Sequence, residues 1–304
     1  MWFRFFVFIV VLMTGIFAIP RPSAAQQVNL LIQIQPKEIQ QGRTGIIRVV
    51  APGDITRMQV LFQGDVLPMY RTNEGDWIGF LVADMSATRG GDIPVDVYTW
   101  AGETAYPPQR DTVSIVWGSF DYQDIPIPYG QEDLLNPDLN REELNLMVRI
   151  YSRRTEQKYW TGALQLPVMG PQISSFGGIR TYNNGALESR HTGVDYRAGL
   201  GESVMASGTG VVVFAQRLPI RGNHVVIDHG WGVMTGYSHL NEIYVVPGQR
   251  VVAGDIIGTV GATGRVQGAH MHFELTVNGF WVDPPQFLNF TIPEAADSIL
   301  VARR

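Results

Sequence analysis

Histidine and aspartate side chains with the spacing of metal ligands gather in the second half of the sequence. All six histidines of the 304-residue chain lie between residues 191 and 272. His270 and His272 are two apart in a β-type segment, so both side chains project to one face of the expected strand. His191 and Asp195 are four apart in an extended or turning segment. These two residues and one strand histidine would form a catalytic zinc site with three protein ligands and an open position for water.

His239 is a candidate for a role other than metal binding. Hydrolysis by an activated water needs a base for the water's proton and a donor for the oxyanion, and a histidine with a near-neutral pKa serves both needs. The alternative is that His239 ends a strand and that His270 and His272 are ordinary strand residues. His224 and His229 are expected to be structural.

A series of short segments extends this pattern over roughly residues 167–288. In chain order they are Phe176-Gly177 with Arg180, His191-x-x-x-Asp195, Gly210–Val213, Val226–Gly230, Tyr237–Leu240, Val246-x-Gly248 with Val251, Gly254 with Ile257-Gly258, Gly261 with Gly264, His270–Glu274 and Val282-Asp283-Pro284. The combination resembles the LytM/lysostaphin-type zinc metalloendopeptidases, which cut peptide bonds in bacterial peptidoglycan.

The resemblance assigns a role to each candidate residue. It implies that His191, Asp195 and His272 bind one Zn²⁺ per chain, and that His239 and His270 are catalytic histidines that do not bind it. It also implies an antiparallel β-rich peptidase fold and a peptidoglycan peptide as substrate. The alternative is a non-catalytic relative that binds the cell wall or activates an amidase. Because all five positions are kept, we expect an active zinc metalloendopeptidase.

Other chemistries fit the composition and local pattern less well. The chain has no cysteine, which excludes thiol catalysis, disulfides and Cys-ligated zinc. Its formal net charge of −5 argues against nucleic acid as the main partner. Ser238 adjoins His239 and would face the other side of a strand, and the chain has no Gly-x-Ser-x-Gly motif. A serine hydrolase is therefore not expected.

The remaining sequence predicts a mainly β protein that positions this site. Residues 26–118 alternate short β-type segments with turn residues and predict a small Ig-like β-sandwich as an accessory domain. Residues 119–163 predict a linker with one helix, which starts near Asn136-Pro137-Asp138 and buries Leu144, Met147, Val148 and Tyr151. Residues 164–290 return to a β pattern and form the predicted zinc peptidase domain. Residues 291–304 are expected to be a C-terminal tail.

The N-terminus has the features of an export signal. Arg4 precedes an apolar run over residues 5–19, and Ser23 and Ala25 give a small-x-small site before Gln26. This pattern predicts a signal peptide over residues 1–25 and a secreted protein in an extracellular, periplasmic or cell-wall location. The alternative is an uncleaved membrane anchor. The oligomeric state stays open.

Overall fold

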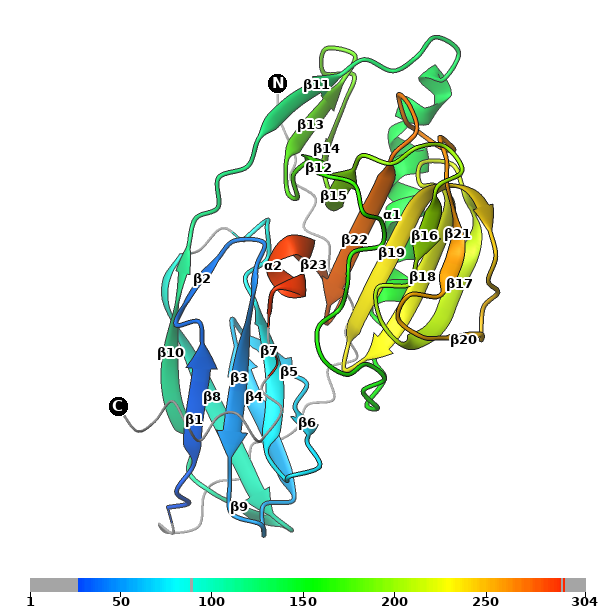
Figure 1. Cartoon of the computed structure of the whole chain (residues 1–304). Coiled ribbons are helices and arrows are strands. Elements are labelled where there is room, and N and C mark those ends of the chain that lie inside the picture. Colours follow the sequence, from blue (N-terminus) through cyan, green and yellow to red (C-terminus); the bar gives the residue numbers. More distant parts are fainter. Residues whose placement is uncertain (1–26, 88–89, 291, 293–304) are drawn as a thin grey trace.

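The protein is mainly β, as predicted. The computed structural model describes residues 27–87, 90–290 and 292. It contains two sheet-rich regions that lie side by side, one built from the N-terminal and one from the C-terminal strands (Figure 1). The predicted signal peptide, and the predicted tail apart from Ile292, lie outside the described residues. Among the described helices, none has the length and apolar character needed to cross a bilayer.

Two sheets with a shared core form the N-terminal region. One sheet has the order β1-β3-β7-β6 and the other β2-β10-β8-β4-β5, with β9 beside β8. Their buried aliphatic side chains, including Ile34, Ile47 and Leu81 from the first sheet and Val60 and Val95 from the second, form one cluster. The bounds are β1 Leu31–Gln35, β2 Glu38–Gln40, β3 Thr44–Val50, β4 Arg57–Phe62, β5 Asp65–Leu67, β6 Tyr70–Arg71, β7 Trp77–Val82, β8 Gly91–Ala101, β9 Thr104–Ala105 and β10 Gln109–Val116. The region is thus a two-layer β structure, and its Ig-like character stays a prediction.

The segment predicted as an irregular linker contains a strand. Residues Tyr122–Ile125 form β11, which pairs in parallel with β13 (Ile179–Tyr182), and β13 pairs with β14 (Leu187–Arg190). The main-chain groups along one edge of β11 are therefore satisfied by strand pairing. A short 3₁₀ helix, η1 (Glu132–Leu135), then leads to α1 (Pro137–Tyr151).

Helix α1 begins where the sequence predicted, but its buried face differs in part. The Asn136 side chain caps the helix by accepting a hydrogen bond from the Asp138 amide at 2.8 Å. Met147 and Tyr151 are buried as expected, whereas Leu144 is 39% exposed. Glu143 is buried in its place. The expectation for Leu144 was wrong because ionic partners on the sheet side of the helix hold Glu143 inward.

The C-terminal region is a ten-stranded sheet. Its main path is β12-β15-β22-β19-β18-β17-β20, with β16, β21 and β23 attached to its members. α1 lies behind this sheet in Figure 1, and Met147 and Ile150 of α1 share a cluster with Phe214, Val226 and Met234. The bounds are β12 Gln172–Ser174, β15 Gly193–Tyr196, β16 Ser203–Met205, β17 Gly210–Leu218, β18 Gly222–Gly230, β19 Val233–Ile243, β20 Arg250–Val251, β21 Ile256–Val260, β22 Met271–Val277 and β23 Phe280–Trp281.

A buried apolar interface joins the two regions. Phe80 of the N-terminal region and Leu275 and Val277 of β22 belong to one cluster, in which Tyr70 stacks on Trp231 at a centroid distance of 5.3 Å. Helix α2 (Pro284–Leu288) lies between the regions in Figure 1. Its Gln286 side chain exchanges two hydrogen bonds with the Thr44 main chain, at 3.0 and 2.9 Å. The N-terminal region is therefore packed against the sheet that carries the histidines.

Candidate metal centre

Two neighbouring strands and the turn before them bring His191, Asp195 and His272 together. β15 and β22 are antiparallel, and their register places Asp195 directly opposite His272. His191 lies between β14 and β15. The close approach of the strands requires glycine at position 193, since a Cβ atom there would lie 2.3 Å from the Phe273 carbonyl oxygen. The predicted ligand triad therefore forms where β15 and β22 pair.

The polar atoms of the triad form a nearly equilateral triangle. His191 Nε2 lies 3.0 Å from Asp195 Oδ1 and 3.0 Å from His272 Nδ1, and His272 Nδ1 lies 2.8 Å from Asp195 Oδ1. All three side chains are buried. Ligands at about 2.0–2.2 Å from a tetrahedral zinc ion are roughly 3.3–3.6 Å apart, so small outward movements would suit this triangle to the metal.

Neighbouring groups hold the triad residues in a metal-binding orientation. His191 Nδ1 donates to the Ser175 carbonyl at 2.6 Å, which leaves the Nε2 lone pair directed at the triangle. Arg180 donates to Asp195 Oδ2 at 2.6 Å and to Ser174 Oγ at 2.7 Å. Asp195 Oδ1 is thereby turned toward the two histidines. Two imidazole nitrogens and one carboxylate oxygen are ligands that zinc accepts, so the residues present fit the metal.

The electrostatics of the triad favour the ligand forms of His191 and Asp195. Burial lowers the pKa of His191 to about 4, so this imidazole is neutral at neutral pH. Burial acts to raise the pKa of Asp195, but His191 and His272 hold it well below its ordinary value. Burial acts to lower the pKa of His272, but hydrogen bonding to Asp195 and Glu274 raises it, so a metal ion competes with a proton at this ring.

His239 and His270 lie next to the triad. The His239 ring centroid is 5.0 Å from that of His270 and 5.7 Å from that of His272. His239 Nδ1 donates to the Thr263 carbonyl at 2.8 Å, which leaves its Nε2 as an acceptor. His270 Nδ1 donates to the Gly268 carbonyl at 2.9 Å, and its Nε2 lies 3.7 Å from Asp195 Oδ1. All five predicted site residues therefore converge.

The backbone of His239 adopts a conformation that is rare for residues other than glycine. Its φ is +62°, in the left-handed region, which few residues other than glycine adopt. Burial, followed by the charges of His270 and His272, lowers the pKa of His239 well below its ordinary value. A strained backbone and a buried neutral imidazole are typical of functional positions.

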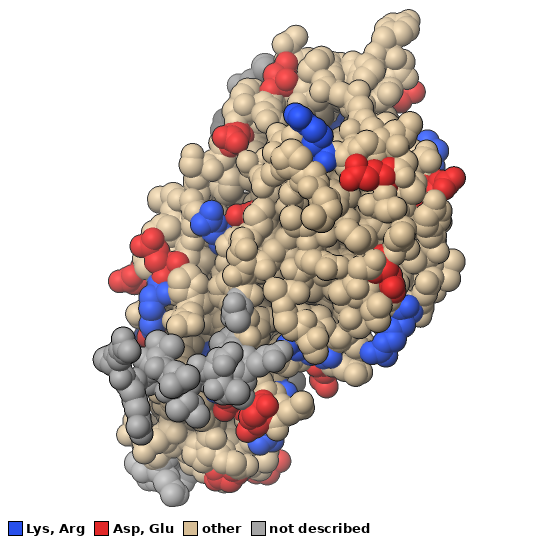
Figure 2. Space-filling view, in the orientation of Figure 1, with Lys and Arg blue, Asp and Glu red and all other residues tan. Residues whose placement is uncertain are grey.

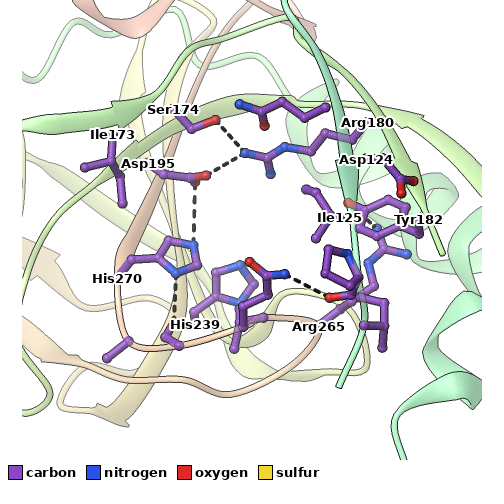
Figure 3. A pocket seen from close by; sticks show the side chains of 17 residues that line it. Asp124, Ile125, Ile173, Ser174, Arg180, Tyr182, Asp195, His239, Arg265 and His270 are labelled. Atoms are coloured by element: carbon purple, nitrogen blue, oxygen red, sulfur yellow. Dashed lines mark hydrogen bonds and ion pairs between the residues drawn. The ribbon is translucent and has the colours of Figure 1, made fainter. Parts of the chain in front are cut away.

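A surface cavity opens beside these histidines (Figure 3). Arg180 points at Asp195 from one side of this view, and His239 and His270 lie together on another. Part of the cavity lining comes from β11 and the residues after it, and the Gln267 amide donates to the Pro126 carbonyl at 2.9 Å. The face of the molecule in Figure 2 carries scattered single charges and no concentrated charged patch.

The other two histidines pack inside the C-terminal region. His229 Nδ1 donates to the Thr209 carbonyl at 3.0 Å, and His224 Nδ1 lies 3.0 Å from Ser238 Oγ. Sequence reasoning missed a buried ionic cluster next to His272, formed by Glu274, Arg221 and Glu143. One signal was available, because Glu274 is two residues after His272 and therefore on the same strand face.

Comparison with known proteins connects this site to one family. Residues 189–284, which include all five site residues, match the family described as Peptidase family M23. The chain is 45% identical over 106 residues to the peptidoglycan DD-endopeptidase ShyA of Vibrio cholerae serotype O1, covering 35% of this chain and 24% of that protein. It is 42% identical over 118 residues to the DD-carboxypeptidase/endopeptidase Mpg of Neisseria meningitidis serogroup B, covering 39% and 27%. The chain thus spans about a quarter of the length of these relatives.

A solved structure is similar over most of the chain. A Pseudomonas aeruginosa structure assigned to peptidase M23 superposes with a TM-score of 0.60 at 25% sequence identity, covering 82% of this chain and 93% of the other. The similarity therefore extends beyond the matched segment. The predicted metallopeptidase family is therefore confirmed for the segment 189–284, which matches peptidase family M23 and contains the His–Asp–His triad.

Proposed function

We propose that the protein is an exported zinc-dependent endopeptidase that hydrolyses peptide bonds in bacterial peptidoglycan. The observation that carries this proposal is the buried triangle of His191 Nε2, Asp195 Oδ1 and His272 Nδ1, with edges of 2.8–3.0 Å, beside His239 and His270. His191, Asp195 and His272 would hold the zinc ion. Bound there, zinc supplies a Lewis acid that polarises the scissile carbonyl and lowers the pKa of water.

The chain's own groups then move the proton and bind the developing charge. His239 Nε2 is free to accept a proton because Nδ1–H is committed to the Thr263 carbonyl. His270 is held in the same way by the Gly268 carbonyl, and its ring lies at the cavity beside His239. One of the two histidines takes the proton of the attacking water, and the other, when protonated, donates to the oxyanion.

The substrate assignment rests on the relatives. The Vibrio protein is named a peptidoglycan DD-endopeptidase and the Neisseria protein a DD-carboxypeptidase/endopeptidase. We propose cross-linked peptidoglycan peptides as the substrate and a periplasmic or cell-wall location reached through the signal peptide. We further propose an Ig-like accessory domain over residues 26–118, a linker with one helix over 119–163 and the peptidase domain over 164–290.

Digestion of purified sacculi tests this function. The purified chain is expected to release soluble fragments, chelation is expected to stop the release, and added zinc is expected to restore it. Mass spectrometry of the new termini identifies the bond that is cut. Binding to sacculi without new termini, with zinc bound, would support the non-catalytic alternative instead. The intact set of five residues favours the enzyme over that alternative.

A further inference from the structure

A buried carboxylate lies behind the metal-binding triad. Glu274 follows His272 by two positions on β22 and is fully buried. Its Oε1 lies 3.5 Å from His272 Nε2, on the edge of the imidazole opposite the Nδ1 atom that faces the triad. A carboxylate at the outer nitrogen of a metal-binding histidine fixes the ring orientation and favours the tautomer that leaves the inner nitrogen free.

Arg221 holds the Glu274 carboxylate by two contacts. Arg221 Nη2 donates to Oε1 at 2.6 Å and Nε donates to Oε2 at 3.2 Å, and the Thr192 hydroxyl also donates to Oε1. This two-point arrangement fixes the plane of the carboxylate as well as its position. The guanidinium is nearly buried, with 11% of its side chain exposed. The cluster is therefore an organised part of the interior.

Helix α1 supplies the remaining partners of this cluster. The Tyr151 hydroxyl donates to Glu274 Oε2 at 2.8 Å. Glu143 accepts hydrogen bonds from Arg221 Nη1 at 3.1 Å and from the main-chain amides of Ile220 and Arg221 at 2.7 and 3.1 Å. Both residues come from α1, which precedes the segment that matches the family.

The packing around the Tyr151 hydroxyl leaves little freedom for it to move. A Cβ atom built on Gly236 would lie 2.2 Å from this hydroxyl and 3.2 Å from Glu274 Oε2. The buried groups also have a defined charge balance, because two carboxylates face one guanidinium. The excess negative charge favours an N–H of His272 that points toward Glu274.

We propose that Glu274 is a positioning residue that accepts the Nε2–H of His272, and that Tyr151 and Glu143 of helix α1 hold the Glu274–Arg221 pair in place. Helix α1 then helps to position a metal ligand, although it lies outside the segment that matches the family. The inference rests on the proposed function, because it assumes that His272 binds the metal through Nδ1. It makes zinc affinity depend on a hydroxyl group of the linker helix.

Zinc affinity of the purified full chain, measured by chelator competition, tests the proposal. Glu274→Gln is expected to weaken zinc binding by roughly 10–100-fold, the usual effect of losing such an outer partner. Tyr151→Phe is expected to weaken it in the same direction by a smaller factor. Tyr237→Phe is the matched control, since it removes a buried hydroxyl that contacts Ser207 and Thr235 and no site residue. Its zinc affinity should equal that of the wild type.

A second readout separates positioning from general loss of stability. Nitrogen-15 spectra of the imidazoles report the tautomer of His272. The fraction of His272 in the Nε2–H form should change in Tyr151→Phe but not in Tyr237→Phe. If Glu274→Gln does not fold, Tyr151→Phe still decides the outcome. Wild-type zinc affinity and an unchanged His272 tautomer in Tyr151→Phe would overturn this inference but not the proposed function. A wild-type chain that binds no zinc would instead overturn the proposed function.

Discussion

The two sheet-rich regions bury different kinds of side chain. Residues 26–118 contain no histidine, and the core between the two N-terminal sheets is almost entirely aliphatic. Its buried acids, Asp76 and Asp96, pair with Arg48 and Arg110. The C-terminal region buries five histidines together with acidic groups: His191, His224, His229, His239, His272, Asp195, Asp228 and Glu274.

The polar groups that lower stability when buried are therefore concentrated in the region that carries the candidate site. A buried polar or charged group destabilises the fold unless hydrogen bonds or an opposite charge satisfy it. In the C-terminal region Arg180, Arg221 and several main-chain carbonyls provide that satisfaction. The N-terminal region lacks this polar interior and packs its apolar side against β22 and its neighbours. Metal binding and turnover should therefore respond to C-terminal substitutions, while N-terminal core substitutions should change stability alone.

The largest expected effect comes from two histidines that are close in space but differ in role. His191→Ala is expected to lose both zinc and hydrolysis, because one of three ligands is removed. His239→Ala is expected to keep zinc and lose about 10²–10⁴-fold in turnover, the range for a general acid–base group. Zinc analysis and sacculus digestion on both variants measure this. Equal metal loss in the two variants would contradict the assignment of ligand and non-ligand histidines.

A core truncation in the N-terminal region should have a large effect on stability only. Leu81 is fully buried between the two N-terminal sheets. Leu81→Ala is expected to lower the free energy of unfolding by about 2–5 kcal/mol through lost burial and a cavity. Denaturant unfolding measures this, and chelator competition should give a wild-type zinc affinity. A weakened zinc site in Leu81→Ala would show that the two regions are not separable in this way.

Acid should destabilise the C-terminal region through its buried histidines. Burial lowers the pKa of His229 to about 4, against about 6.5 in an unfolded chain. Between these values the unfolded state binds the extra proton, so stability falls as the pH falls from 6.5 to 4, by about 3 kcal/mol from this residue. Unfolding free energies of the wild type and His229→Gln across this range should differ in slope. If the two plots of unfolding free energy against pH were parallel, His229 would not be a source of acid sensitivity.

The smallest expected effect is at the surface of the N-terminal region. Lys37 pairs with Asp111 at 2.7 Å, and their side chains are 58% and 26% exposed. Lys37→Ala is expected to change the free energy of unfolding by about 0–1 kcal/mol, less at high salt. Thermal unfolding at two salt concentrations measures this. A loss as large as that of Leu81→Ala would contradict the view that apolar packing dominates here.

Much of the fold could be predicted because local patterns are strong. The alternation of short β-type segments and turn residues predicted for residues 26–118 corresponds to strands β1 to β10. The Asn136-Pro137 start of α1 was readable from capping chemistry. β11 was missed because its two nearby prolines indicate a linker, whereas its hydrogen-bond partners come from β13, more than 50 residues later. Long-range pairing leaves little trace in local sequence.

Within the candidate site, residue types were readable and their surroundings were not. Residue types and spacing made His191, Asp195, His239, His270 and His272 candidates, and the resemblance to the LytM/lysostaphin-type enzymes divided them into expected ligands and expected catalytic histidines. Glu143 looked like an ordinary acid near a helix start, where exposed acids are common. In the structure it is buried against Arg221, a residue 78 positions away. No helix-local rule could reveal this, because the partner lies on another element.

The sequence by itself determined the β-rich class, the helix that starts after Asn136 and the set of side chains able to bind zinc, because periodicity, capping and residue chemistry are local properties. Only the tertiary structure decided which imidazole nitrogen faces the triad, which carboxylate lies next to the outer nitrogen of His272 and which helix donates a hydrogen bond to that carboxylate. Those choices depend on the register of β15 against β22 and on the packing of α1 behind the sheet. Register and packing are set by contacts between residues far apart in the chain.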